Sequence, residues 1–375
     1  MIPLIRPDIS FAEVADDIRG ILDSGMLTRG MYVRAFEDAV RDFVGRRYAF
    51  ATTSATTALH LSLVALGIGA GDEVLVSDFT FPASGNVIVE AGAQPVLVDC
   101  AQGRFDLDVE DLARKITPKT RAIMVVDPFG QSADMEAVSA LAARHGLAVV
   151  EDAACALGAS RNGRRCGTWP GAGCFSFHPR KVVTTGEGGM IVTDDAALAD
   201  RIELLRSHGG RPVGGRFVFE ACGFNYRLSE IPAALGLAQM RRVESIIADR
   251  RQTALCYLDA LAGLDLSIPL STSAQECSFQ SFVVLLDDAI DRDAVVARMR
   301  EDGIETTIGT YAMHAHPAFA RFGYAPGDLP HSYRAECQAL TLPLVPRMEP
   351  ALVRHVVATL QQAMRHAPTR SRSAQ

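Results

Sequence analysis

One lysine stands out in this chain because of the residues around it. Residues 174–181 are Cys-Phe-Ser-Phe-His-Pro-Arg-Lys, and residues 184–189 are Thr-Thr-Gly-Glu-Gly-Gly. The alternating apolar residues between Gly173 and Pro179 predict a short strand that ends just before Lys181. The glycines that follow allow the backbone to pass close to a ligand. Lys181 is therefore a candidate for an amine that does chemistry, although most lysines are solvated surface residues.

Two other positions have residue types that could act with this lysine. A predicted strand at residues 147–152 ends in Asp152, and the segment Thr52 to Thr57 leads into an apolar helix whose first N–H groups and hydroxyls suit a phosphate. Pyridoxal phosphate needs a lysine, a carboxylate facing its pyridine nitrogen, an anion site and a support for its ring, for which Phe81 is a candidate. Each of these features also has an ordinary explanation as a helix cap, an ion-pair partner or a core residue.

The elements that must position these residues alternate between strand and helix. Short, almost wholly apolar strands separated by helices are typical of a mainly parallel sheet that is flanked by helices. Ligands in such α/β sheets bind beyond the carboxyl ends of the strands, where Asp152 and Lys181 are both expected. The predicted strands are residues 47–52, 73–77, 95–99, 122–126 and 147–152, and the predicted helices are residues 11–22, 32–44, 55–66, 82–91 and 134–145.

The C-terminal half has a different pattern. Ser229 is expected to cap one long helix from Glu230 to about Gln252, after a glycine-rich loop at residues 209–223. A strand at 278–287 with helices at 293–302 and 351–364 then predicts a small α+β domain. The expected division is a large domain at residues 1–250, a small C-terminal domain at residues 251–365 on which the N-terminal helix packs, and a disordered tail at residues 366–375.

Composition excludes several classes of protein. The net charge of −7 argues against a nucleic-acid binder, and no apolar run is long enough for a membrane span. The first residues lack the apolar segment of a signal peptide, and the eight cysteines form no CxxC pair, so we expect a cytoplasmic protein without disulfides or zinc. Histidines at 314, 316 and 331 have no carboxylate or cysteine at ligand spacing, so no metal site is expected.

Motifs along almost the whole chain, from about Ile2 to Met364, resemble those of the DegT/DnrJ/EryC1/StrS family of sugar aminotransferases, which are fold type I pyridoxal-phosphate enzymes. The motifs that carry the resemblance are Ala65–Val74, Phe79-Thr80-Phe81, Phe129-Gly130-Gln131, Glu151–Ala154, Ser176–Gly189, Gly223–Glu230 and Leu342-Pro343-Leu344. The resemblance implies a homodimer with shared active sites. It also implies a cofactor that alternates between pyridoxal and pyridoxamine phosphate.

The resemblance also implies a role for particular residues. Lys181 would form the Schiff base and move the proton, and Asp152 would pair with the pyridine nitrogen. The remaining residues implied in cofactor binding are Ala55, Thr56 and Ser176 at the phosphate, Phe81 on the ring, Cys155 near the phenolic oxygen, and Asn225 reaching the phosphate from the partner subunit.

Two of these positions depart from the family pattern. Ala55 stands where glycine is usual, which preserves its N–H group, and Cys155 stands where glutamine or histidine is usual. A thiol is a weak donor, so we expect the contact of Cys155 with the cofactor to be lost or replaced by water. Asn225 has an alternative interpretation, since asparagine is also a good cap for the helix of its own chain.

The implied reaction moves an amino group from L-glutamate, or glutamine, to a keto-sugar nucleotide. The Thr184–Gly189 sequence resembles the branch that acts on 4-keto-6-deoxy sugars, and a 3-keto sugar or a cyclitol ketone is the alternative. Lys181 argues against the dehydratase branch, which carries histidine there. An amino-acid transaminase of the same fold would be expected to have an arginine in its small domain that binds the substrate's α-carboxylate. No such arginine is evident, although Arg347 is left open. A cofactor-binding regulator without activity is the last alternative.

Overall fold

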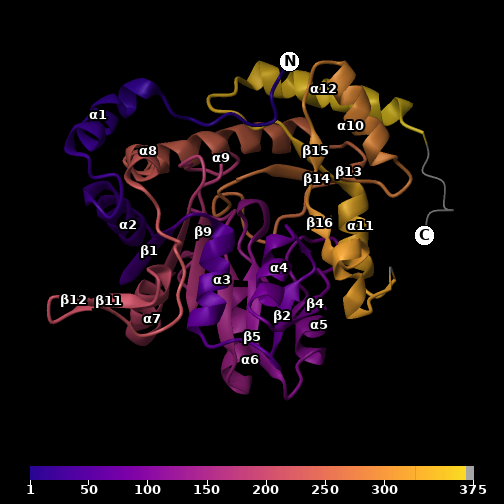
Figure 1. Ribbon diagram of the computed structural model, residues 1–375. Coiled ribbons are helices and arrows are strands. Elements are labelled where there is room, and N and C mark those ends of the chain that lie inside the picture. Colours follow the sequence, from indigo (N-terminus) through magenta and orange to yellow (C-terminus); the bar gives the residue numbers. More distant parts are fainter. Residues whose placement is uncertain (326, 369–375) are drawn as a thin grey trace.

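The computed structural model describes residues 1–325 and 327–368, and its centre is a seven-stranded sheet (Figure 1). Five strands, in the order β9-β6-β5-β2-β4, are parallel, while β10 runs antiparallel to both β9 and β1. The strands in spatial order are β1 (Tyr48–Thr52), β10 (Gly189–Thr193), β9 (Ala172–Ser176), β6 (Ala148–Asp152), β5 (Thr120–Val126), β2 (Glu73–Ser77) and β4 (Gln94–Val98). This architecture confirms the predicted α/β fold with a mainly parallel sheet.

Helices cover both faces of this sheet, which explains why its strands are apolar along their length. Val74 and Val76 of β2 pack in the cluster beneath α3 and α4, while Leu75 between them packs in the cluster with α5 and α6. The helices of the sheet layer are α2 (Met31–Val44), α3 (Ala55–Ala65), α4 (Ala83–Glu90), α5 (Val109–Arg114), α6 (Met135–His145), α7 (Ala196–Arg206) and α8 (Glu230–Met240).

A second, smaller sheet lies in the C-terminal region, at the upper right of Figure 1. Its strands pair antiparallel in the order β13-β14-β17-β15, and their apolar faces pack on three helices. Its elements are α9 (Val243–Ala260), β13 (Leu266–Ser267), β14 (Phe282–Leu286), α10 (Arg292–Glu301), β15 (Thr307–Ile308), β17 (Ala339–Leu342) and α12 (Pro350–His366). Helix α9 runs across residue 250, and the division into two domains stays a prediction.

The remaining elements are short. Strand β16 pairs with β3, which brings the C-terminal region back to the central sheet. At the N-terminus, Ile2 pairs with Ile304. These elements are η1 (Phe11–Glu13), α1 (Ala15–Ser24), β3 (Phe79–Thr80), η2 (Pro128–Gly130), β7 (Ser160–Arg161), β8 (Arg164–Arg165), β16 (Tyr311–Ala312), η3 (Met313–Ala315), η4 (Pro317–Phe322) and α11 (Pro330–Gln338). Within the described part of the chain, no helix has the length and apolar character to cross a membrane.

The single long helix predicted from Glu230 was wrong, because the chain bends between α8 and α9. Arg242, at the bend, has a non-helical conformation (φ −131°, ψ 20°). Its guanidinium group makes ion pairs with Asp8 at 2.7 Å and Glu13 at 2.8 Å, both in the N-terminal segment. The helical pattern in the sequence continues through the bend, so tertiary contacts determine where the helix ends. The predicted helix at residues 11–22 is similarly divided, into η1 and α1.

The predicted loop at residues 209–223 contains a β-hairpin, which projects at the left of Figure 1. Its strands are β11 (Gly210–Val213) and β12 (Arg216–Phe219). Gly214 and Gly215 form its turn, both with positive φ, which is the glycine-glycine signature of a tight hairpin turn. Of the predicted disordered tail, His366 belongs to α12, and residues 369–375 lie outside the described part of the chain.

Candidate active site

The register of three neighbouring strands brings the predicted phosphate ligands together. Thr52 at the end of β1 is paired with Gly189, and Gly189 is paired with Ser176 at the end of β9. The chain continues from Thr52 into α3, where the Ser54 hydroxyl accepts a hydrogen bond from the N–H of Thr57 (3.1 Å). The N–H groups of the first helical residues have no acceptor within a helix. The first turn of α3, with Ser176 beside it, is therefore a site for an anion.

Gly189 allows this close arrangement. A Cβ atom there would lie 2.3 Å from the carbonyl oxygen of Ser54 and 2.7 Å from the backbone nitrogen of Ala55. Because such contacts are impossible, only glycine lets β10 begin directly against the start of α3. The glycine that the sequence motif contains thus shapes the anion site.

Asp152 lies at the carboxyl end of β6, as predicted, and is almost fully buried. Its Oδ2 accepts a hydrogen bond from the Ser84 hydroxyl (2.7 Å), and its Oδ1 accepts one from the N–H of Ala154 (3.2 Å). Burial raises the pKa of Asp152, while these hydrogen bonds and the charge of Lys181 act in the opposite direction. Ser84, on α4, was missed because its sequence gives no sign of a polar partner.

Lys181 lies beside Asp152 in space, as the motifs implied. Its Nζ is 3.0 Å from the sulfur of Cys155, which follows Asp152 by three residues. The backbone N–H of Lys181 donates to the carbonyl of His178 (2.9 Å), forming a turn. The structure therefore brings the amine, the buried carboxylate and the thiol together. The thiol contacts the lysine amine, and its expected position near the cofactor stays a prediction.

Phe81, directly after β3, is not a core residue. It is 65% exposed, and its ring centroid lies 6.3 Å from that of Tyr311. Asn225 does not cap the helix of its own chain, because Ser229 is the N-cap residue of α8. Asn225 pairs instead with Ser207, next to the loop that leads into α3. The cap interpretation was therefore wrong, and a role in the partner subunit stays a prediction.

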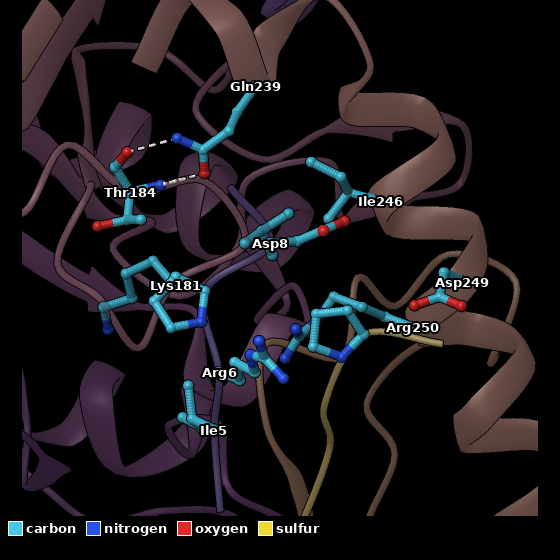
Figure 2. Close-up of a pocket in the computed structure, with 12 residues that line it drawn as sticks. Ile5, Arg6, Asp8, Lys181, Thr184, Gln239, Ile246, Asp249 and Arg250 are labelled. Atoms are coloured by element: carbon cyan, nitrogen blue, oxygen red, sulfur yellow. Dashed lines mark hydrogen bonds between the residues drawn. The ribbon is translucent and has the colours of Figure 1, made fainter. Parts of the chain in front are cut away.

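A small cavity lies between the loop that carries Lys181, the N-terminal residues 5–8, α8 and α9 (Figure 2). Arg6, Asp249 and Arg250 line this cavity together with Lys181. Arg347, which the sequence left open as a carboxylate ligand, makes an ion pair with Asp8 at 3.0 Å. Its guanidinium group is therefore already engaged by a carboxylate of the same chain.

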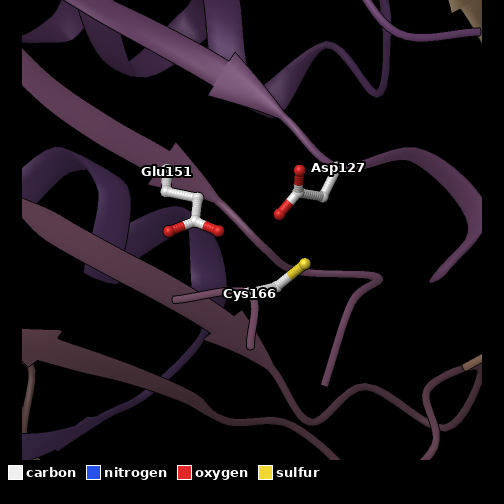
Figure 3. A group of neighbouring side chains, drawn as sticks. All are labelled: Asp127, Glu151 and Cys166. Atoms are coloured by element: carbon white, nitrogen blue, oxygen red, sulfur yellow. The ribbon is translucent and has the colours of Figure 1, made fainter. Parts of the chain in front are cut away.

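A buried cluster that the sequence did not reveal includes Glu151, the residue before Asp152 in β6 (Figure 3). Asp127, Glu151 and Cys166 are each at most 1% exposed, and one ligand atom of each lies within 4.8 Å of the others. Glu151 precedes Asp152 in β6, so its side chain points to the opposite face of the sheet. Burial and the charge of Glu151 raise the pKa of Asp127, and burial raises that of Glu151. Two adjacent buried carboxyl groups disfavour each other's ionisation, so we expect them to share one proton.

This proton gives a testable dependence of stability on pH. Because the pKa values are raised in the folded protein, the contribution of the pair to the free energy of unfolding is complete at low pH. It is lost as the pH rises through the raised pKa. In Asp127→Asn, the amide oxygen still accepts from the N–H of Ala133, and the NH₂ group can donate to Glu151 without a titrating proton. We expect the free energy of unfolding of this variant to exceed that of the wild type by about 1–2 kcal/mol at alkaline pH. In acid the difference should be small.

Thermal unfolding followed from about pH 4, near the ordinary carboxyl pKa, into the alkaline range measures this difference. Cys166→Ala is the matched control, because it removes the thiol from the cluster and leaves both carboxyl groups. The hydrogen bond from Cys166 lowers the pKa of Asp127, so this variant should keep the wild-type slope of melting temperature against pH and extend it to higher pH. An Asp127→Asn variant with that same slope would show that the two carboxyl groups do not share a proton.

Comparison with known proteins agrees with this geometry. The chain matches the DegT/DnrJ/EryC1/StrS aminotransferase family over residues 9–361. It is 40% identical over 339 residues to a GDP-perosamine synthase from Caulobacter vibrioides, covering 89% of this chain and 91% of the relative. DesV from S. venezuelae, solved in complex with a ketimine intermediate, is 33% identical with a TM-score of 0.90, covering 96% of this chain and 98% of DesV.

A protein from Streptococcus pneumoniae described as a sugar aminotransferase, solved in its PMP form, is 25% identical. Its TM-score is 0.93, and the match covers 97% of this chain and 99% of that protein. The residues at the ligand edge fit this cofactor: an amine beside a buried carboxylate, and a helix N-terminus opened by a glycine that no larger residue could replace. The chain therefore belongs to the DegT/DnrJ/EryC1/StrS family and is a pyridoxal-phosphate-dependent aminotransferase.

Proposed function

We propose that this aminotransferase moves an amino group from L-glutamate to a keto-sugar nucleotide. The observation that carries the proposal is the meeting of Lys181, Asp152 and the first turn of α3 at one edge of the sheet. Pyridoxal phosphate supplies, when bound, an electron-withdrawing ring that stabilises negative charge on the substrate carbon. The residues of this chain must bind that group, hold its charge state and move the proton.

In this proposal, each residue has one task. Asp152 faces the pyridine nitrogen, where its ionised form keeps a proton on that nitrogen. Lys181 Nζ takes the proton from the substrate carbon and returns it on the other side of the reaction, as a positioned base. Phe81 covers the ring with its exposed face. The N–H groups of the α3 first turn, together with Ser176, would hold the phosphate. The amine of Lys181 would then face the reacting carbon, and the carboxylate of Asp152 would face the pyridine nitrogen.

The substrate class rests on the relatives and on the motif after the lysine. A named GDP-perosamine synthase at 40% identity supports a nucleotide-linked sugar as the amino acceptor. The Thr184–Gly189 sequence supports a 4-keto-6-deoxy sugar. L-glutamate is the proposed amino donor, with glutamine as the alternative.

A substrate panel tests the proposed function directly. The enzyme would be assayed with L-glutamate and, separately, with L-glutamine as the donor. The acceptors are GDP- and dTDP-linked 4-keto-6-deoxy sugars, a 3-keto sugar nucleotide and a cyclitol ketone. We expect kcat/KM for one 4-keto-6-deoxy nucleotide to exceed the others by about tenfold or more, because a buried polar group that loses its partner discriminates strongly. Mass spectrometry of the aminated product and an assay for 2-oxoglutarate measure this.

Other results of the panel would contradict the proposal. A preference for the cyclitol ketone or the 3-keto sugar would show that the proposed acceptor is wrong. Faster reaction with glutamine would show that glutamine, not L-glutamate, is the donor. Turnover of neither donor, with a tightly bound cofactor, would favour a regulator without aminotransferase activity.

We also propose a homodimer in which Asn225 completes the phosphate site of the partner subunit. Mixing two inactive variants tests this. Lys181→Ala lacks the base, and Asn225→Asp sets a carboxylate against the phosphate. In a mixed dimer, a shared site puts both lesions in one active site and leaves the other intact. Equal amounts give about half mixed dimers, so about a quarter of all sites should regain activity, given twofold symmetry.

The readout is activity after reassortment, with mass photometry to confirm that dimers have exchanged subunits. Mixing Lys181→Ala with Asp152→Asn is the control, because both residues lie at the same site in one chain. That mixture leaves each site of the mixed dimer with one lesion, whether or not sites are shared through Asn225, and it should stay inactive. If the Asn225→Asp mixture behaves like this control, Asn225 serves its own chain.

A further inference from the structure

We propose that Gln239 and Gln280 are positioning residues that fix the backbone on both sides of Lys181. The Gln280 Nε2 donates to the carbonyl oxygen of Arg180 (2.8 Å). The Gln239 Oε1 accepts from the N–H of Thr184 (3.0 Å), and its Nε2 donates to the carbonyl oxygen of Thr184 (2.6 Å). We call these two side chains the glutamine bracket.

The bracket is buried and therefore well suited to hold the loop. Gln239 is 1% exposed and Gln280 is 5% exposed, so water does not compete for their hydrogen bonds. Figure 2 shows the paired bonds of Gln239 with Thr184, with Lys181 beside them. The anchored residues lie one position before and three positions after the lysine. The backbone of Lys181 is therefore tied from two directions, in addition to its own turn with His178.

Each member of the bracket is itself held by other residues. The guanidinium group of Arg250, buried in α9, donates to the carbonyl oxygens of Phe279 (2.8 Å) and Gln280 (2.6 Å). On the other side, Gly130 lies so close that a Cβ atom there would be 2.6 Å from the backbone nitrogen of Gln280. Gln239 also donates to the carbonyl of Leu235 within α8. The bracket therefore connects the lysine loop to α8 and to the start of the smaller sheet.

The consequence for catalysis follows from the shape of lysine. Its amine stands on a flexible four-carbon stem, so a small shift of the backbone displaces the nitrogen. A misplacement of about 1 Å can cost about 100-fold in rate. This inference rests on the proposed role of Lys181, through which the bracket acts without touching substrate. The bracket would therefore affect kcat more than KM.

The experiment replaces each glutamine with methionine, which has a similar length and no hydrogen-bonding amide. Gln131→Met is the matched control: Gln131 is also 5% exposed and bonds the carbonyl of Pro269 (3.1 Å) and the N–H of Ser271 (2.7 Å), away from the lysine loop. Four quantities are measured: melting temperature, kcat and KM with glutamate, the pH midpoint of the cofactor's visible absorbance, and the rate at which the apoenzyme takes up pyridoxal phosphate.

We expect Gln239→Met and Gln280→Met to lower kcat by about 10- to 100-fold with little change in KM, to shift the absorbance midpoint, and to slow cofactor uptake. Gln131→Met should lose similar thermal stability without these changes. If either methionine variant does not fold, Gln280→Glu keeps the shape and places an acceptor where the amide donates to the carbonyl oxygen of Arg180, and the same changes are expected.

Variants that match Gln131→Met in all four quantities would overturn the bracket. Borohydride labelling separates this failure from that of the proposed function. If the variants behave like the control and the label is still on Lys181, only the proposed role of the glutamine bracket is rejected. If the label in the wild type is on another residue, the proposed role of Lys181 in the reaction is rejected as well.

Discussion

Lys181→Ala is expected to lower turnover with glutamate by about 10⁴-fold, the upper end of what a positioned base contributes. In the proposed function, the variant loses both the amine that would hold the cofactor and the group that would move the proton. Steady-state assays and the rate of the glutamate half-reaction, followed by absorbance, measure the loss. A residual rate within tenfold of the wild type would show that another group is the base.

The composition of the chain makes this prediction unusually sharp. It contains only three lysines, Lys115, Lys119 and Lys181. Borohydride reduction of the yellow holoenzyme should place the cofactor label on the peptide with Lys181 alone. Lys119→Ala is the matched control, because Lys119 is exposed and its carbonyl pairs with the first residue of β2, at the opposite end of the parallel strands. It should keep full activity and full labelling.

The second large effect is expected for Asp152→Asn, which should lower turnover by about 10²–10³-fold while the protein still binds some cofactor. The amide has nearly the shape of the carboxylate but no charge to keep a proton on the pyridine nitrogen. Its oxygen can still accept from the Ser84 hydroxyl, so the fold should be preserved. Turnover within a fewfold of the wild type would show that Asp152 is structural.

Ser84→Ala separates the charge of Asp152 from its surroundings. The hydrogen bond from Ser84 lowers the pKa of Asp152 against the effect of burial, so its removal should raise that pKa further. Because the carboxylate is the required form, the acid limb of the rate profile should move to higher pH, with full activity restored in alkali. Asp152→Asn should show no such recovery.

The sequence predicts the fold and most of the central elements because local patterns and tertiary structure agree there. Strand β2 has the predicted bounds, Asp152 is the last residue of β6, and Lys181 lies on the loop that follows the end of β9 at Ser176. Continuous apolar strands have few alternatives to a covered parallel sheet. The side chains at their ends then have to meet at one edge.

Contacts between distant segments could not be predicted in this way. The shared proton of Asp127 and Glu151 depends on which face each strand presents, and nothing local in the sequence shows that the two carboxyl groups meet. The bond between Gln280 and Arg180 joins residues 100 positions apart. The bend at Arg242 depends in the same way on carboxylates near the N-terminus. Such pairs have no periodicity that a sequence would reveal.

The antiparallel orientation of β10 has a consequence for engineering. Both ends of the segment at residues 177–188, which carries Lys181, are fixed on adjacent strands at Ser176 and Gly189. An insertion or deletion there would have to be absorbed within the loop, where it would displace Lys181 or break the hydrogen bonds that hold Arg180 and Thr184. The turn at Gly214 and Gly215 has open space around both residues. Variants that change loop length should therefore keep residues 177–188 at their native length, whereas the turn at Gly214 and Gly215 has room for an insertion.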